Sequence, residues 1–168
     1  MTTLYDGGWF SYNRSDGISY IEEAKDGVTV LCYDKSKGDK PFLLLHEMVS
    51  ALRSDYPQLV SLTGSIDEGE HPRDTVLREL SEEAGVVVLS ENVHWLGPIF
   101  TYKACTKATY LFFADIENCS WTRAIGDGSS VEENAYVRWH SLEELLQSKD
   151  SLLLATYARS LTKLQPLR

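Results

Sequence analysis

The sequence has few basic residues for its acidic content: 16 Lys and Arg stand against 25 Asp and Glu, for a net charge of −9. A protein that binds duplex DNA or an anionic membrane surface needs a basic face, so this balance argues against both classes. Long apolar runs are also missing. Runs such as 42–45 and 110–114 are far shorter than the roughly 20 apolar residues of a membrane-spanning helix. We therefore expect neither a duplex nucleic acid nor a membrane as partner.

Cysteine is scarce too, with Cys32, Cys105 and Cys119 showing no CxxC spacing. This excludes a disulfide scaffold and the usual zinc motifs, and it fits a reducing compartment. The first residues lack a basic segment followed by an apolar one, so no signal peptide is expected. No internal repeat or low-complexity tract appears. The sequence predicts a cytoplasmic protein with one domain over 1–168.

Short apolar runs between turn residues predict the strands of this domain, and capping signals predict its helices. The strands are predicted at 18–24, 27–33, 41–46, 59–62, 93–102, 108–116 and 135–139. The helices are predicted at 72–84, where Pro stands first and Gly follows, at 141–147 and at 151–164. Residues 1–16 are predicted to be irregular. This order indicates an α/β fold with a mixed sheet between helices.

The negative charge is concentrated in two segments. Residues 64–86 hold seven acids and two bases, net −5, and residues 127–150 hold six acids and two bases, net −4. The remainder of the chain is neutral. The two acidic segments therefore need a local explanation.

Three glutamates of the first segment share one side of the predicted helix. Glu79, Glu82 and Glu83 are spaced i, i+3, i+4, opposite an apolar stripe. Like charges one turn apart disfavour a helix by a few tenths of a kcal/mol, and anions in its C-terminal half oppose the helix dipole. A divalent cation would reverse both effects, and carboxylate oxygens suit Mg²⁺. A solvated acidic face is the alternative.

The spacing around these glutamates favours the metal site. Residues 64–86 follow the pattern GX5EX7REUXEEXGU at every position, where U is an aliphatic residue. This pattern is the Nudix box. The chain therefore resembles the Nudix hydrolases, and the resemblance implies an α/β/α sandwich fold and the hydrolysis of a nucleoside diphosphate linked to another group.

The resemblance also implies roles for single residues of the box. The metal ion would be Mg²⁺, with Mn²⁺ as the alternative. Its ligands would be the carboxylates of Glu79, Glu82 and Glu83 and the backbone carbonyl of Thr63. Glu82 and Glu83 are also the candidate catalytic residues of the box. The remaining box positions would be structural: Arg78 and Glu70 as an ion pair that orients the helix, and Gly64 and Gly85 at turns.

The second acidic segment resembles a loop from which many Nudix enzymes supply a further catalytic Glu. The run 133–139 is similar to the pattern E-x-[aliphatic]-x-V-x-W of the ADP-ribose pyrophosphatase branch. Glu133 and Glu132 are both candidates, and an ordinary solvated loop is the alternative. Glu143, Glu144 and Asp150 are predicted to lie at helix N-termini, where acids complement the dipole.

The sequence indicates the substrate less clearly than it indicates the reaction. The strand before the box and the late Glu loop resemble the ADP-ribose and nucleotide-sugar branch, so a substrate of that class is expected. The alternatives are a nucleoside triphosphate of the house-cleaning type, an RNA cap, a diphosphoinositol phosphate, or a sensor without catalysis. Weaker candidates for substrate binding are Arg53, Trp9, Phe10 and Lys103. Relatives in this branch are commonly dimers, so a homodimer is expected.

Overall fold

A mixed seven-stranded sheet lies at the centre of the computed structural model, which describes residues 1–49, 54–125 and 135–164. The strands follow the order β12-β5-β4-β10-β9, with β6 beside β5 and β7 beside β4. Their bounds are β4 (Gly27–Tyr33), β5 (Phe42–Glu47), β6 (Gln58–Val60), β7 (Leu62–Ser65), β9 (Val93–Phe100), β10 (Ala108–Asp115) and β12 (Tyr136–His140). Since β4 and β10 run parallel and the other pairs antiparallel, the sheet is mixed as predicted.

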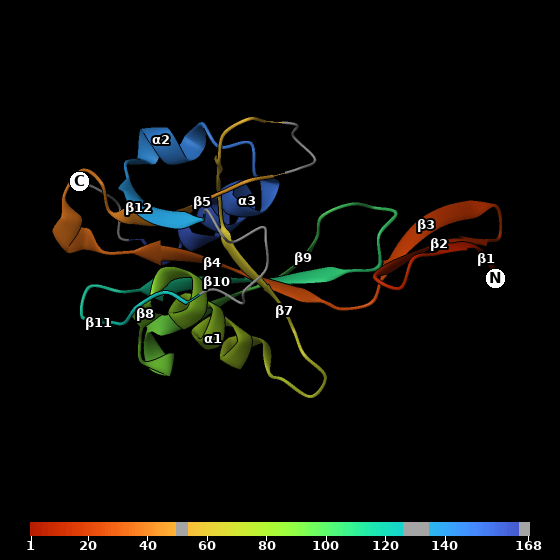
Figure 1. Ribbon diagram of the computed structural model, residues 1–168, viewed down its shortest axis with the longest axis horizontal. Helices are drawn as coiled ribbons and strands as arrows, with labels where there is room; N and C mark the ends of the chain where they lie inside the picture. Colours follow the sequence, from red (N-terminus) through yellow and green to blue (C-terminus); the bar gives the residue numbers. More distant parts are fainter. Residues whose placement is uncertain (50–53, 126–134, 165–168) are drawn as a thin grey trace.

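Helices cover both faces of this sheet. Figure 1 shows α1 (Pro72–Ala84) on one side, and α2 (Leu142–Leu146) and α3 (Ser151–Ser160) on the other. Successive side chains of β4 point to opposite faces of the sheet and so contribute to two hydrophobic cores. Val28 and Val30 face α1, whereas Leu31 faces α2 and α3. Two 3₁₀ turns, η1 (Lys35–Lys37) and η3 (Ser90–Asn92), connect strands. Within the described ranges, no helix is long and apolar enough to cross a membrane.

The second acidic segment supplies helix caps, as predicted for Glu144 and Asp150. Ser141 and Glu144 form a capping box at the start of α2, each accepting a hydrogen bond from the other's backbone N–H. Asp150 caps α3 by accepting from Leu152 N at 2.8 Å. Those two carboxylates therefore satisfy helix N-termini.

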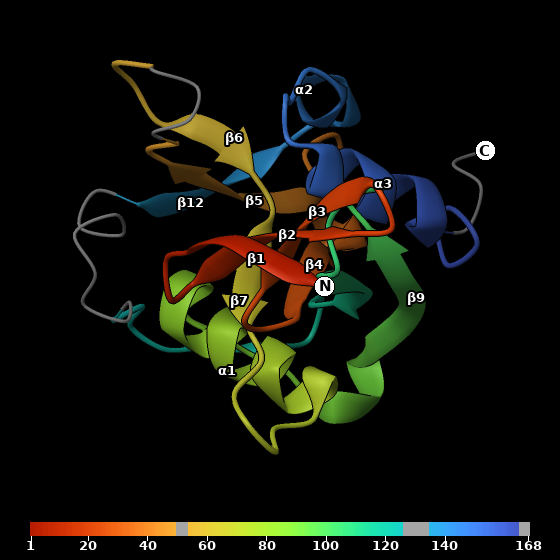
Figure 2. The same ribbon diagram turned by 90° about the vertical axis from the view of Figure 1, so that its right-hand side faces the viewer.

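Residues 1–16 were predicted to be irregular, and this prediction is wrong. The chain forms β1 (Thr2–Asp6) and β2 (Phe10–Ser15), which pair with β3 (Ile18–Glu23) in a separate antiparallel sheet. Asp16 and Gly17, both with positive φ, make the two-residue turn between β2 and β3, a hairpin signal that the prediction overlooked. Figure 1 shows this sheet projecting from the body of the protein, and Figure 2 looks along the projection, with the sheet in front.

The predicted strand 59–62 is extended at three of its four residues, but it is not one strand, because the chain divides into β6 and β7 at Ser61. The backbone N–H and the hydroxyl of Ser61 both donate to Asp150 Oδ2, at 2.8 and 2.7 Å, which holds this residue out of the sheet ladder. Asp150 is far away in sequence, so local patterning could not reveal the break. A small sheet of β8 (Val86–Val87) and β11 (Ser120–Trp121) was not predicted either.

Candidate functional site

The helix α1 places the box residues, and it has the predicted bounds. Pro72 stands at the first helical position, and His71 caps the helix through its ring nitrogen, which accepts from Arg73 N at 3.2 Å. Gly85 ends the helix in the left-handed conformation, with φ of 65°. Val76 and Leu80 are buried against the sheet. The three glutamates Glu79, Glu82 and Glu83 are all partly buried, and Oε2 of Glu83 is fully buried.

Arg78 connects the loop before α1 to the acidic side of the helix. Its guanidinium contacts both carboxylate oxygens of Glu70, Nε to Oε1 at 3.2 Å and a terminal nitrogen to Oε2 at 3.3 Å. The other terminal nitrogen donates to Glu79 Oε1 at 2.8 Å and to Glu82 Oε2 at 3.1 Å. Arg78 also donates to the carbonyl of Ser65 at 3.3 Å. The guanidinium of Arg78 thus holds one carboxylate before the helix and two within it.

The hydrogen bond from Arg78 holds the pKa of Glu70 well below its usual range, at about 2. The same contacts raise the pKa of Arg78, so the ion pair stays charged across the physiological range. Because the Glu70 side chain is only 18% exposed, solvent screens the pair weakly.

Glu70 is expected to make stability depend on pH. A folded-state pKa below the unfolded value stabilises the protein above about pH 4.5, and this stabilisation is lost as the pH falls toward 2. We expect Glu70→Gln to lower the free energy of unfolding by about 1–3 kcal/mol at pH 6. Urea titrations from pH 6 to pH 3 check this. A difference between the two proteins that stays constant over this range would contradict the assignment.

Gly64 makes room for Glu79, and it lies within β7 and not at a turn as predicted. A Cβ atom on Gly64 would lie 2.1 Å from Glu79 Oε1 and 2.4 Å from its Cγ, so the carboxylate occupies the space that any other residue would fill. The backbone of β7 and the first glutamate of the helix are therefore in direct contact. The side chain of Glu79 is only 12% exposed in this position.

Gly64→Ala is expected to displace Glu79 with little effect on folding. The clash is with a side chain that can rotate, and φ of Gly64 is not positive, so the loss of unfolding free energy should stay below about 1.5 kcal/mol. The displaced carboxylate should instead weaken the divalent-metal affinity about tenfold or more. Mn²⁺ titration by calorimetry measures this. Unchanged affinity would contradict the role of the contact.

The donor set fits a divalent cation by its chemistry. The acidic side of α1 offers oxygen ligands on a rigid element, and a glycine leaves space beside it, which suits a hard cation. Within the described ranges, however, no three His, Cys, Asp or Glu side chains converge on one point that could hold a metal ion. Arg78 binds Glu79 and Glu82 in this arrangement. A bound cation would therefore require side-chain rotation.

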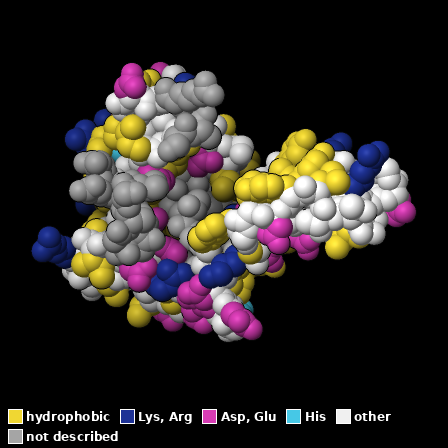
Figure 3. Space-filling model, turned by 45° about the vertical axis from the view of Figure 1, so that its right-hand side comes forward, with side chains coloured by type: hydrophobic (Ala, Val, Ile, Leu, Met, Phe, Trp, Pro, Cys, Tyr) yellow, Lys and Arg dark blue, Asp and Glu magenta, His cyan; other side chains and the backbone are white. Residues whose placement is uncertain are grey.

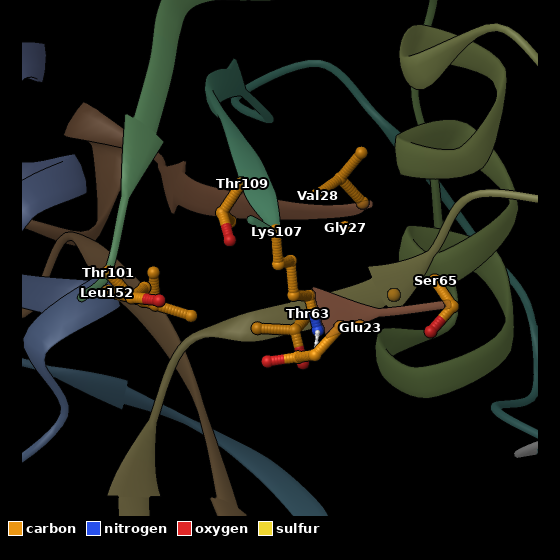
Figure 4. Close-up of a pocket in the computed structure, with 10 residues that line it drawn as sticks. Glu23, Gly27, Val28, Thr63, Ser65, Thr101, Lys107, Thr109 and Leu152 are labelled. Atoms are coloured by element: carbon orange, nitrogen blue, oxygen red, sulfur yellow. Dashed lines mark ion pairs between the residues drawn. The ribbon is translucent and has the colours of Figure 1, made fainter. Parts of the chain in front are cut away.

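A pocket of about 260 Å³ lies beside the start of the box (Figure 4). Thr63 and Gly64 of β7 form one wall, and Gly27 of β4 lies next to them. Lys107, just before β10, and Glu23 of β3 point toward each other inside it. Sequence reasoning missed both of these residues, because neither belongs to a motif and they come from separate segments.

The other predicted site residues are not all brought together. Thr63 lines the pocket, whereas Lys103 lies exposed in the turn after β9. Trp9 and Phe10 are exposed, on the projecting N-terminal sheet, 74% and 44% respectively. Arg53 and the two loop glutamates, Glu132 and Glu133, lie outside the described residues.

Comparisons with known proteins agree with this geometry. The NUDIX domain model matches residues 24–161. Nudix hydrolase 26, chloroplastic, from Arabidopsis thaliana is 44% identical over 54 residues, which cover 30% of this chain and 25% of that protein. The match thus spans about a quarter of the relative's length. The crystal structure of an ADP compounds hydrolase has a TM-score of 0.69 with 16% identity, and the match covers 96% of this chain and 92% of the other.

The family match extends over most of the chain, and the structural match shows the Nudix α/β fold. The family match confirms the family that the box predicted, and the structural match confirms the fold class. The box, its position on α1 and these matches together show that the chain belongs to the NUDIX domain family, the family of the Nudix pyrophosphohydrolases.

Proposed function

We propose that the protein hydrolyses the pyrophosphate of a nucleoside diphosphate linked to another group, with ADP-ribose or a nucleotide sugar as its substrate. One observation carries this proposal: a complete box places Glu79 against Gly64, at the edge of a pocket of about 260 Å³. A non-catalytic sensor would not need to retain Arg78, Glu79, Glu82 and Glu83 together. Nudix enzymes bind nucleotide substrates and typically use a divalent metal ion.

Mg²⁺, or Mn²⁺ in its place, would be held by Glu79, Glu82 and Glu83, together with the backbone carbonyl of Thr63. When bound, the cation neutralises charge that develops on the phosphate oxygens. Arg78 orients two of these carboxylates by direct hydrogen bonds and ties them to Glu70. Glu133 or Glu132 would accept a proton from the attacking water, a role that is supported by the resemblance of the run 133–139 to the catalytic Glu loop. The chain therefore contributes mainly positioning and electrostatic stabilisation.

A substrate panel tests the proposal. The protein with Mg²⁺ is offered ADP-ribose, a nucleotide sugar, a nucleoside triphosphate, an RNA cap analogue and a diphosphoinositol phosphate, and kcat/KM is measured for each. We expect ADP-ribose or the nucleotide sugar to give the highest value, with a nucleoside monophosphate as product. A higher value for one of the other three would change the substrate class. No turnover of any of them would contradict an enzymatic function.

We also propose that residues 1–168 act as one domain and that two copies form a homodimer. Several large apolar side chains of the N-terminal sheet are exposed, among them Tyr5, Trp9, Phe10 and Ile18. Figure 3 shows hydrophobic side chains gathered on this projecting sheet. A second copy would remove such a surface from water. Light scattering measures the mass in solution, and a monomer at micromolar concentration would contradict the proposal.

A cytoplasmic location stays a prediction.

A further inference from the structure

The pocket beside the box contains a charge pair that the family motif does not include. We propose that Lys107 binds a phosphate group of the substrate and that Glu23 is the positioning residue that holds Lys107 in the pocket. The inference rests on the proposed function, because it takes a nucleoside diphosphate as the ligand. It adds a specificity-determining contact from outside the box.

Charge is the first argument for this role. The box segment carries a net charge of −5, which repels a diphosphate before any cation is bound. Among the described residues that line the pocket, Lys107 is the one base and Glu23 the one acid. The ammonium has three donors, and its contact with Glu23 Oε2 at 2.9 Å uses one of them. Lys107 can therefore donate to phosphate oxygens while it remains next to Glu23.

Position is the second argument. A Cβ atom on Gly27 would lie 3.3 Å from Cε of Lys107 and 3.2 Å from the carbonyl oxygen of Gly64. Gly64 in turn contacts Glu79, the first carboxylate of the helix. Since Gly64 pairs with Val28 and not with Gly27, Lys107 and Glu79 lie on opposite faces of the β4–β7 pair. Thr63, whose carbonyl is the candidate metal ligand, lines the same pocket as Lys107, so a phosphate group bound there lies next to both the ammonium and the start of the box.

The N-terminal sheet fixes this arrangement through backbone contacts. Ile21 N donates to Ala104 O at 2.6 Å, and Thr106 N donates to Ile21 O at 2.9 Å, so β3 is attached to the segment that precedes Lys107. The thiol of Cys105 donates to Glu23 Oε1 at 3.4 Å. Glu23 stands one residue before the region that the family model matches. A part of the chain outside the matched region therefore completes the pocket.

ADP binding measured by calorimetry, with and without Mg²⁺, tests the role of Lys107. We expect Lys107→Met to weaken ADP binding about tenfold or more, and Lys107→Arg, which keeps the charge, to weaken it about threefold or less. Adenosine, which has no phosphate, should bind both variants as it binds the original protein. Lys35→Met is the matched control, because Lys35 also pairs with a glutamate, Glu117 at 3.1 Å, but beyond the other end of β4. It should leave ADP binding unchanged.

The role of Glu23 is tested by a double-mutant cycle. Glu23→Ala should weaken ADP binding when Lys107 is present and have no effect in the Lys107→Met background, whereas Glu23→Gln should retain most of the affinity. Additive losses would show that Glu23 acts independently of Lys107 and would overturn the positioning role. If Lys107→Met does not fold, as judged by circular dichroism, Lys107→Gln replaces it.

The substrate panel separates this inference from the proposed function. Turnover of ADP-ribose together with unchanged ADP binding by Lys107→Met would overturn the inference and leave the function intact. The opposite result, no turnover but phosphate-dependent loss of ADP binding in Lys107→Met, would overturn the function and support the inference. An equal loss of adenosine binding, or an original protein that does not bind ADP, would overturn the phosphate contact.

Discussion

Glu83→Gln is expected to reduce kcat about a hundredfold or more while the protein stays folded. The amide keeps the shape of the side chain but removes the negative charge that attracts a divalent cation. Changes to residues that only support a metal ligand typically cost 10–100-fold, so the loss of a ligand itself should cost at least the upper end. Raising the Mg²⁺ concentration should recover part of the activity.

Asp74→Asn is the matched control for this experiment. It removes one negative charge from the same helix, but at an exposed position in the first turn, away from the three glutamates. Its kcat should stay within about twofold of the original value, since a distant surface charge is screened by salt. A near-normal kcat for Glu83→Gln, with the control unchanged, would contradict the metal-site assignment.

Gly85→Ala is expected to lower the free energy of unfolding by about 2–4 kcal/mol. The residue adopts φ of 65°, where an L side chain costs about 1–2 kcal/mol. A Cβ atom there would also lie 2.4 Å from the carbonyl oxygen of Thr122, which is backbone and cannot rotate away. Thr122 N donates to Gly85 O at 2.8 Å, so the clash would disturb the attachment of β11 beside β8.

Gly69→Ala separates the two causes of this loss. Gly69 has φ of 79°, but a Cβ atom there would meet nothing within 4 Å. In urea titrations, Gly69→Ala should therefore lower the free energy of unfolding by about 1–2 kcal/mol, which is the cost of the left-handed conformation alone. Equal losses at the two positions would show that the contact with Thr122 contributes nothing.

The sequence predicted α1 to the residue, because its signals are local and consistent. Pro72 and Gly85 mark the two ends, and the apolar stripe has helical spacing. The box could be read for the same reason, since its pattern lies within 23 consecutive residues. Chemistry that depends on a short continuous segment is therefore accessible without a structure.

Two of the errors have long-range causes. The break at Ser61 depends on Asp150, and the pocket pairs Glu23 with Lys107 across two separate segments. Neither pairing leaves a spacing signal. The N-terminal sheet is different, because the Asp16-Gly17 turn was visible in the sequence and was overlooked. Glu132 and Glu133 stay predictions, since they lie outside the described residues.

Hydrolysis of ADP-ribose in ¹⁸O-labelled water tests the central claim most directly. With Mg²⁺ present, we predict equimolar AMP and ribose 5-phosphate, with one ¹⁸O atom in the phosphate group of one product, because water attacks a phosphorus of the pyrophosphate. Mass spectrometry of the separated products measures this. Release of inorganic phosphate, unlabelled products, or no cleavage of any pyrophosphate by the folded protein would contradict the account.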